Sequence, residues 1–438
     1  MKGLYLSGVL VTFTLAAMLA AWSWQQRIDE DAMDRASKFS SFASFPGAVP
    51  NDAPRRFAVG LNACVDLIVP ALEVFSMLAM DGESVEARDH DKIESLMELE
   101  ETFKFFFQKG GAGERFVSNS ALFKQIVGAS RSVEGGRFFV GGNAALMGLT
   151  IKDKGVSVLS KSDKDISVLM GGAVGPRLSS LLDNKMVFAE GATMEEDDYH
   201  VILEYPKGAQ WGGSVAPRAN RFIISCDMTN ARMATLEAFT AALSSFAPDI
   251  VVLSGLHMLE GETEEFRESR VQDFIGMLKT VPETTPIHLE LASMAIVPYV
   301  KHIADQVFSF VDSIGLNEQE LELVSQSANG PHRKLTNIQG LADTAKVCDT
   351  LFWLLKTYGG KSSKLTRVHF HSLTFHVIAH LEGSWRHSER AVVAGSWACT
   401  TRACQNDTPS LDEVSLQLQQ PFSISTKSPD LLLDVTTK

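Results

Sequence analysis

The chain is 438 residues long, 45% of them hydrophobic and 21% charged, and it carries a formal net charge of −13. This composition supports a packed core and excludes wholesale disorder. The acidic balance, without any basic block, argues against a protein that holds DNA or RNA by charge. A phosphate ligand would have to be bound by backbone donors, helix ends and metal ions.

The five cysteines are too few and too scattered for a disulfide framework. No Cys-x-x-Cys pair occurs, so the spacing does not predict a zinc site. Cys399 and Cys404 are close enough in sequence to pair in an oxidising compartment, although a disulfide also requires a specific separation of the two Cα atoms. Their disulfide state is left open.

The N-terminus is an uncharged, apolar run over residues 4–24, preceded by Lys2 and followed by Arg27 and three acidic residues. About 20 apolar residues are enough to cross a bilayer as a helix. The charge asymmetry predicts that the rest of the chain is translocated. We therefore expect a signal peptide or a signal anchor over residues 1–24, a linker over 25–56, and a location in the secretory pathway, in the endoplasmic reticulum lumen or outside the cell.

Short apolar strands alternate with amphipathic helices along the remainder of the chain, from residue 57 onward. The expected strands cover residues 57–62, 167–170, 250–255, 287–291, 313–317 and 368–371, and the clearest helices cover 94–108, 263–280 and 343–358. This alternation predicts an α/β fold with a largely parallel sheet. In such a sheet, ligands bind beyond the carboxyl ends of the strands.

Two familiar nucleotide-binding loops are missing. Gly360-Lys361-Ser362 resembles the end of a phosphate loop, but Leu355 occupies the position of its first glycine. No Gly-x-Gly-x-x-Gly follows a predicted strand. Walker-type ATPases, protein kinases and dinucleotide enzymes are therefore excluded.

Two polar segments are candidates for ligand contacts. Asn62 and Asp66 follow the first expected strand at its transition to a loop, where they can hydrogen-bond adjacent sugar hydroxyls; the alternative is turn formation and helix capping. Gly141 and Gly142 precede Asn143 and allow a ligand to approach the backbone at a helix N-terminus; the alternative is a plain turn.

Acidic residues end two further strands. Glu290 lies in His-Leu-Glu, and Glu320 in Asn-Glu-Gln-Glu. Such carboxylates can hold Mg²⁺ through its waters, whereas the alternative is a pair of solvated surface acids. His369, His371, His376 and His380 are interpreted as ordinary strand-end and helix histidines, of which only the first two share a strand face.

Taken together, these motifs resemble the eukaryotic ADP-dependent glucokinases of the ribokinase-like superfamily in order and spacing. The matching segments are 60–66, 113–116, 140–146, 174–176, 202–205, 219–223, 253–258, 288–294 and 315–321. The resemblance implies a doubly wound α/β domain with a smaller lid domain. It implies phosphoryl transfer from ADP to the 6-hydroxyl of glucose, giving glucose 6-phosphate and AMP. We expect a monomer, and the acidic composition predicts that it does not bind nucleic acid.

Site residues follow from the same resemblance. The residues at sugar-binding positions are Asn62, Asp66, Glu114, Gly141, Gly142 and Asn143. Glu290 and Glu320 match the acids associated with Mg²⁺, and His371 matches a region near the adenine of the nucleotide.

One family feature is missing. The family carries a Gly-x-Gly-Asp motif near its C-terminus, whose Asp takes the proton of the sugar hydroxyl and whose backbone N–H groups form an anion hole. Here the last glycine is Gly395, so the catalytic residue is unknown and the kinase domain, over 57–438, is expected to be incomplete. The chain is then either truncated or an inactive relative that binds sugar or nucleotide without turnover.

Overall fold

The computed structural model describes residues 55–159, 166–336, 342–372, 375–386 and 431–434, together with 388, 391, 392 and 395. The expected N-terminal segment over 1–24, nearly all of the linker, and Cys399 and Cys404 lie outside this part of the chain. The chain divides into unit 1, which contains residues 1–57, 153–166 and 248–438, and unit 2, which contains 58–152 and 167–247. Within the described ranges, no helix combines the length and apolar character needed to cross a membrane.

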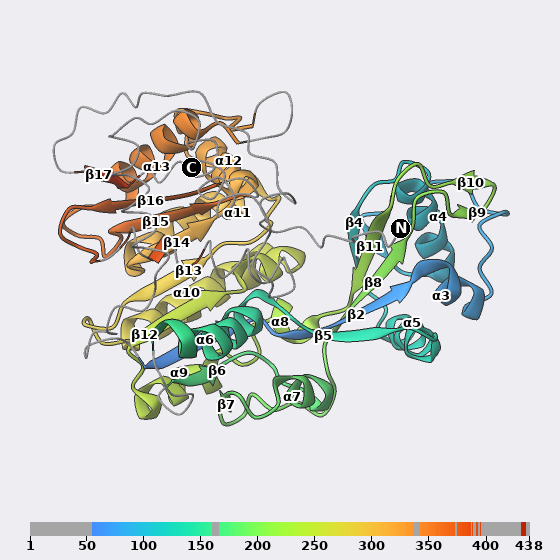
Figure 1. Ribbon diagram of the computed structural model, residues 1–438, viewed down its shortest axis with the longest axis horizontal. Helices are drawn as coiled ribbons and strands as arrows, with labels where there is room; N and C mark the ends of the chain where they lie inside the picture. Colours follow the sequence, from blue (N-terminus) through green and yellow to red (C-terminus); the bar gives the residue numbers. More distant parts are fainter. Residues whose placement is uncertain are drawn as a thin grey trace, which may run out of the picture. The chain divides into compact units, whose positions relative to one another are not determined.

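Unit 1 contains six neighbouring strands in the order β17-β16-β15-β14-β13-β12 (Figure 1). The strands are β12 (Ile250–Ser254), β13 (Ile287–Glu290), β14 (Ser313–Leu316), β15 (Arg367–His371), β16 (His376–Leu381) and β17 (Leu431–Asp434). β12 to β15 are parallel, and β16 and β17 are added antiparallel. The predicted parallel strands are therefore confirmed here to within one or two residues.

Helices connect these parallel strands. They are η3 (Leu256–Gly261), α10 (Glu264–Thr280), α11 (Val297–Val307), η4 (Phe308–Phe310), α12 (Glu318–Ser327) and α13 (Thr344–Tyr358). Local sequence sets where they begin, because the side chains of Thr263 and Asp343 accept hydrogen bonds from the first turns of α10 and α13. β12 and β14 are almost wholly buried, as expected for strands covered on both faces.

Unit 2 is built around a six-stranded sheet in the order β3-β4-β11-β8-β2-β5. The strands are β3 (Lys92–Ile93), β4 (Gly113–Val117), β11 (Asn220–Ser225), β8 (Tyr199–Tyr205), β2 (Cys64–Pro70) and β5 (Arg137–Gly141). This sheet is mixed rather than largely parallel, since β8 and β11, and likewise β2 and β5, run antiparallel. The remaining strand pairs are parallel.

Three helices lie beside this sheet: α3 (Ala71–Met77), α4 (Leu96–Phe107) and α5 (Ser120–Ser132) (Figure 1). Aromatic side chains form the centre of the core between them, namely Phe75, Phe103, Phe107, Tyr205, Trp211 and Phe222. Edge-to-face contacts such as Phe75 against Phe103, with ring centroids 4.4 Å apart, add to the free energy of burial. The helix predicted over 94–108 is confirmed as α4, capped by Ser95.

The other elements of unit 2 are the strands β1 (Arg56–Leu61, in unit 2 from Ala58), β6 (Ser167–Met170), β7 (Val187–Phe188), β9 (Gln210–Trp211) and β10 (Ser214–Val215), and the helices α6 (Asn143–Leu159, in unit 2 up to Lys152), α7 (Pro176–Leu182), α8 (Met228–Ala231) and α9 (Leu236–Phe246). The strands predicted over 57–62 and 167–170 are β1 and β6. One local expectation is wrong: Asp66 does not follow a strand into a loop. The chain crosses from β1 through Asn62 and Ala63 into β2, and Asp66 lies inside that second strand.

Candidate functional site

The glycine pair of unit 2, Gly141 and Gly142, packs closely against residues 62–66. An alanine Cβ at Gly142, where φ is +81°, would lie 2.8 Å from the Cα of Ala63. A Cβ at Gly141 would overlap a carboxylate oxygen of Asp66 and lie 2.7 Å from the sulfur of Cys64. Glycine is therefore required at both positions, because the backbone packs directly against residues 62–66. The close approach is to another part of the protein, whereas a ligand was expected from the sequence.

Asn62 and Asn143 lie at the start of α6. The Asn62 side chain is buried, and its Oδ1 accepts a hydrogen bond from the backbone N–H of Ala144 at 3.1 Å. Asn143 is the first residue of the helix, directly after Gly142. Asn62 Oδ1 therefore caps the N-terminus of α6, which was the alternative interpretation of this residue. Asn143 begins the helix, as predicted.

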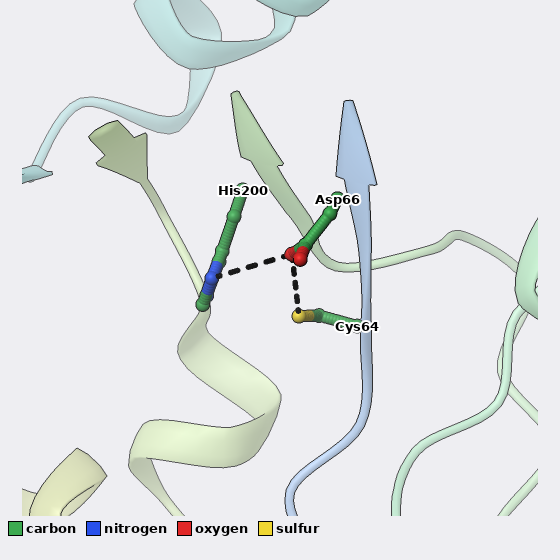
Figure 2. Close-up of side chains that lie close together, drawn as sticks. All are labelled: Cys64, Asp66 and His200. Carbon is green, nitrogen blue, oxygen red and sulfur yellow. Dashed lines mark hydrogen bonds and ion pairs between the residues drawn. The ribbon is translucent and has the colours of Figure 1, made fainter. Parts of the chain in front are cut away.

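Asp66 faces a group that also contains Cys64 and His200 (Figure 2). Asp66 Oδ1 lies 3.7 Å from Cys64 Sγ and 3.9 Å from His200 Nδ1. Burial raises the pKa of Asp66, and the charge of His200 opposes this shift. Glu114, exposed on β4, is close enough for its charge to raise the Asp66 pKa further.

His200 is a member of this group that the sequence analysis missed. It lies on β8, directly opposite Asp66 in the parallel pairing of β2 with β8. Its Nε2 lies 3.3 Å from Oδ2 of Asp227, a nearly fully buried residue. Burial disfavours the charged imidazole, but Cys64 and Asp227 outweigh it and raise the His200 pKa well above its usual range. No local motif marks this histidine, because only strand register brings it to Asp66.

Asp227 is held in turn by Asn230. The Asn230 Nδ2 donates to both carboxylate oxygens of Asp227 at 2.7 Å and to the backbone oxygen of Ala63 at 2.9 Å. Its Oδ1 accepts from the Ala63 N–H at 3.1 Å. Burial opposes ionisation of Asp227, yet the hydrogen bond and charge of His200 keep its pKa below the usual value. The link between β1 and β2 is thereby fixed to the residue that orients His200.

The candidate metal acids lie in unit 1. Glu290 is the last residue of β13, and it accepts a hydrogen bond from His371 Nε2 at 2.7 Å and one from His288 Nε2 at 3.2 Å. Although burial opposes ionisation, these two histidines lower the pKa of Glu290 well below its usual range. A Cβ at Gly315, on the neighbouring strand, would overlap Glu290 Oε2, so the glycine leaves room for the carboxylate.

Glu320 lies in the first turn of α12, directly after β14. Its Oε2 accepts from the backbone N–H of Asn317 at 2.8 Å and its Oε1 from the Asn317 side chain at 2.9 Å, while Asn317 caps the helix in return. Burial raises the pKa of Glu320 to about 7, and the charge of Glu290 contributes to the shift. The two predicted acids are therefore near enough to repel each other.

His369 and His371 lie on β15 as expected, but the other two histidines of this group do not lie where the sequence indicated. His376 and His380 are on β16, not on a helix, and His376 pairs directly with His371 across the β15–β16 hairpin. His376 Nδ1 lies 3.1 Å from His369 Nε2, so three of the four share one face. Burial lowers the pKa of His376 to about 4 and that of His369 well below its usual value, so both are neutral at pH 7. His371 contacts Glu290; its nucleotide role stays a prediction.

Known proteins support the resemblance. The model of the ADP-specific phosphofructokinase/glucokinase conserved region matches residues 55–436. The ADP-dependent glucokinase of Bos taurus is 40% identical over 375 residues, which are 85% of this chain and 73% of that protein. The probable ADP-dependent glucokinase of Caenorhabditis elegans is 33% identical over 392 residues, covering 87% of this chain and 76% of that protein.

Solved structures agree on the fold. The last common ancestor of ADP-dependent phosphofructokinases from Methanosarcinales superposes with a TM-score of 0.59 at 18% identity, over 82% of this chain and 76% of that chain. A hypothetical ADP-dependent phosphofructokinase from Pyrococcus horikoshii gives a TM-score of 0.60 at 16% identity, over 77% and 78%. The predicted α/β, ribokinase-like fold is therefore confirmed, and the chain belongs to the ADP-specific phosphofructokinase/glucokinase family.

Proposed function

We propose that the protein is an ADP-dependent glucokinase, which transfers a phosphoryl group from ADP to the 6-hydroxyl of D-glucose and releases glucose 6-phosphate and AMP. The observation that carries this choice is the 40% identity to a glucokinase across 85% of the chain. Within the family, glucose rather than a sugar phosphate is the substrate that this relative's name gives.

The sugar is proposed to bind at the Asp66 group in unit 2. The Asp66 carboxylate can accept hydrogen bonds from sugar hydroxyls, and its side chain is one-quarter exposed. Glu114 and Asn143 supply further polar atoms, and Asn62 holds the start of α6 in place. Gly141 and Gly142 let the chain come close without a side chain in the way.

Magnesium is proposed to bind near Glu290 and Glu320. The residues fit the ion: burial raises the pKa of Glu320, the charge of Glu290 adds to the shift, and a divalent cation would relieve the repulsion between the two acids. Mg²⁺ prefers one or two carboxylates together with water and phosphate oxygens. When bound, Mg²⁺ would neutralise charge on the phosphate oxygens. His288 and His371 hold the Glu290 carboxylate ionised and oriented.

Proton transfer from the sugar hydroxyl needs a positioned base, which is typically worth about 10²–10⁴ in rate. In the family this base is expected in a Gly-x-Gly-Asp motif, which does not occur in the 438 residues. The rate of AMP formation therefore reports on the base, whereas glucose binding reports on the sugar site, and the two are measured separately.

The decisive experiment measures AMP formation from ADP and glucose with Mg²⁺, beside glucose binding by calorimetry on the same preparation. AMP that depends on glucose supports the kinase, and ATP in place of ADP should give no product. Binding without any AMP would favour the alternative of a sugar-binding relative without turnover. Absence of glucose binding by a folded preparation would refute the proposal. Sedimentation of the same sample is expected to show a monomer.

A location in the secretory pathway is also proposed, supported by the uncharged apolar run over residues 4–24. Protease protection of the full chain in microsomes tests it. A chain that enters the vesicles should resist protease until detergent is added, and a chain digested at once would contradict the proposal. N-terminal sequencing of the protected product then distinguishes cleavage from anchoring.

A further inference from the structure

We propose that Cys64, Asp66 and His200 form a binding site for Zn²⁺, and that zinc and sugar exclude each other there. The second half rests on the proposed function, because it requires Asp66 to be a sugar ligand. Thiolate sulfur, imidazole nitrogen and carboxylate oxygen are the three protein ligand types that Zn²⁺ takes. The spacing of the cysteines gave no sign of such a site, since His200 is distant in sequence and only strand pairing brings it near.

The ligand atoms are already close to the distances that a zinc ion needs. One atom from each residue lies within 4.8 Å of the other two, with 3.7 Å between Cys64 Sγ and Asp66 Oδ1 and 3.9 Å between His200 Nδ1 and Asp66 Oδ1 (Figure 2). Typical zinc–ligand bond lengths in a tetrahedron place such atoms about 3.4–3.6 Å apart. Asp66 thus needs to move by a few tenths of an ångström, and the Cys64 and His200 ligand atoms, which lie within 4.8 Å of each other, must approach by up to about 1 Å.

A second layer of contacts orients the histidine as in known zinc sites. Ligating imidazoles usually hydrogen-bond a carboxylate through the nitrogen that does not face the metal. Here His200 Nε2 contacts Asp227, which leaves Nδ1 directed at Asp66. Asp227 is itself fixed by two hydrogen bonds of 2.7 Å from Asn230. The group is therefore held by surroundings that a chance cluster of surface residues lacks.

The site has one exposed side. Gly141 lets Asp66 and Cys64 pack directly against its backbone, since a Cβ there would lie 2.7 Å from the sulfur. Cys64 is buried, whereas the side chains of Asp66 and His200 are 25% and 19% exposed. Three protein ligands with one open position, filled by water, is the arrangement of zinc sites that exchange ligands.

Binding releases protons and forms three bonds. The Cys64 thiol loses its proton to become a thiolate, His200 Nδ1 gives up its proton where it carries one, and Asp66 binds as the carboxylate. The thiolate and the carboxylate together balance the charge of Zn²⁺, and no redox step is involved. Mg²⁺ prefers oxygen ligands and several waters, so the magnesium of a kinase assay does not compete for this site.

Exclusion follows from the shared carboxylate. An Asp66 oxygen bonded to zinc cannot accept the same hydrogen bond from a sugar hydroxyl. By mass action, zinc at ten times its own dissociation constant raises the apparent Kd of glucose about tenfold.

The test uses Co²⁺ as a coloured substitute for zinc, on the reduced, metal-free full chain. We expect one equivalent of Co²⁺ to give a thiolate-to-cobalt charge-transfer band that Zn²⁺ abolishes. Cys64→Ser should remove the band, and His200→Asn should weaken cobalt binding at least about tenfold. The matched control Cys348→Ser changes another buried cysteine, in unit 1, and should keep the band. A wild-type chain without the band, or a band that survives Cys64→Ser, overturns the proposal.

Two readouts keep this test separate from the proposed function. Circular dichroism of each variant reports folding, and where Cys64→Ser fails to fold, the loss of cobalt affinity in a folded His200→Asn variant decides the metal site. Glucose titrated into the cobalt form should reduce the band. A preparation that shows the band but binds no glucose retains the zinc site and refutes the kinase. One that binds glucose equally well with and without saturating zinc refutes exclusion.

Discussion

Replacing Gly141 with alanine tests the proposed sugar site most directly. The backbone of Gly141 has no left-handed φ, so alanine is conformationally allowed and only the space is missing. Its Cβ would lie 2.6 Å from Asp66 Cγ and 2.7 Å from Cys64 Sγ, whereas ordinary contacts begin at 3.4 Å. The carboxyl group must therefore move by about 1 Å, a displacement that can cost about 10²-fold in a positioned group.

The size of the effect can be worked out from two contributions. Overpacking of a filled site typically costs about 1–3 kcal/mol of stability. A hydrogen bond to a charged group contributes about 1.5–3 kcal/mol, so losing one between Asp66 and the sugar should raise the Kd of glucose about 10- to 150-fold. Unfolding in urea measures the first contribution, and calorimetry with glucose measures the second.

Gly128→Ala is the matched control. Gly128 lies on α5, where an added Cβ would meet nothing within 4 Å. Alanine there should leave glucose binding unchanged and stabilise the helix by about 0.5–1 kcal/mol. If Gly141→Ala binds glucose within twofold of the wild type while keeping its fold, the sugar does not depend on Asp66 at this position, and the reasoning is wrong.

Three further predictions concern the groups that hold these sites. Asn230→Ala should lower the free energy of unfolding by about 3 kcal/mol or more, because it strands the buried N–H and C=O groups of Ala63; an unchanged urea midpoint would contradict this. Burial and the charge of Glu290 raise the pKa of Glu320 from 4.5 to about 7, so the folded chain binds more protons than the unfolded chain between these values. The free energy of unfolding without metal should thus fall as pH rises from 4.5 to about 7. If the thermal midpoint of Glu320→Gln falls with pH as much as that of the wild type, another group causes the pH dependence. Gly315→Ala should reduce kcat more than it raises the KM of glucose, because its Cβ displaces Glu290, whereas Gly276→Ala, with nothing within 4 Å, should match the wild type.

Local features of the sequence predicted the elements of unit 1 well. β13, which ends at Glu290, and α10, which follows Thr263, begin and end within a residue of the expected bounds. Such elements are set by continuous apolar runs and by capping side chains a few residues away, and both are visible in the sequence.

Contacts made through strand pairing were beyond local reasoning. Asp66 was expected in a loop because the polar residues Asn62 and Asp66 interrupt the apolar run. In the structure a second strand, β2, begins directly after Ala63 and contains Asp66. His200 meets Asp66 through the register of β2 with β8, and His376 meets His371 through the β15–β16 hairpin. Register is fixed by tertiary packing rather than by neighbours in sequence, so no spacing rule identifies these partners.

The reciprocal hydrogen bonds between Asn317 and Glu320 give the Glu320 carboxylate a structural role at the helix cap in addition to its proposed role beside the metal. Both oxygens of Glu320 are already engaged in fastening the beginning of α12, and the same group is the proposed neighbour of the metal. Replacing Glu320 with the shorter aspartate would therefore break the hydrogen bonds at the start of α12 and would also move the carboxylate away from the proposed metal position. Loss of activity in such a variant is not by itself proof of a chemical role; the glutamine replacement, which can still accept at the cap, separates fastening from chemistry.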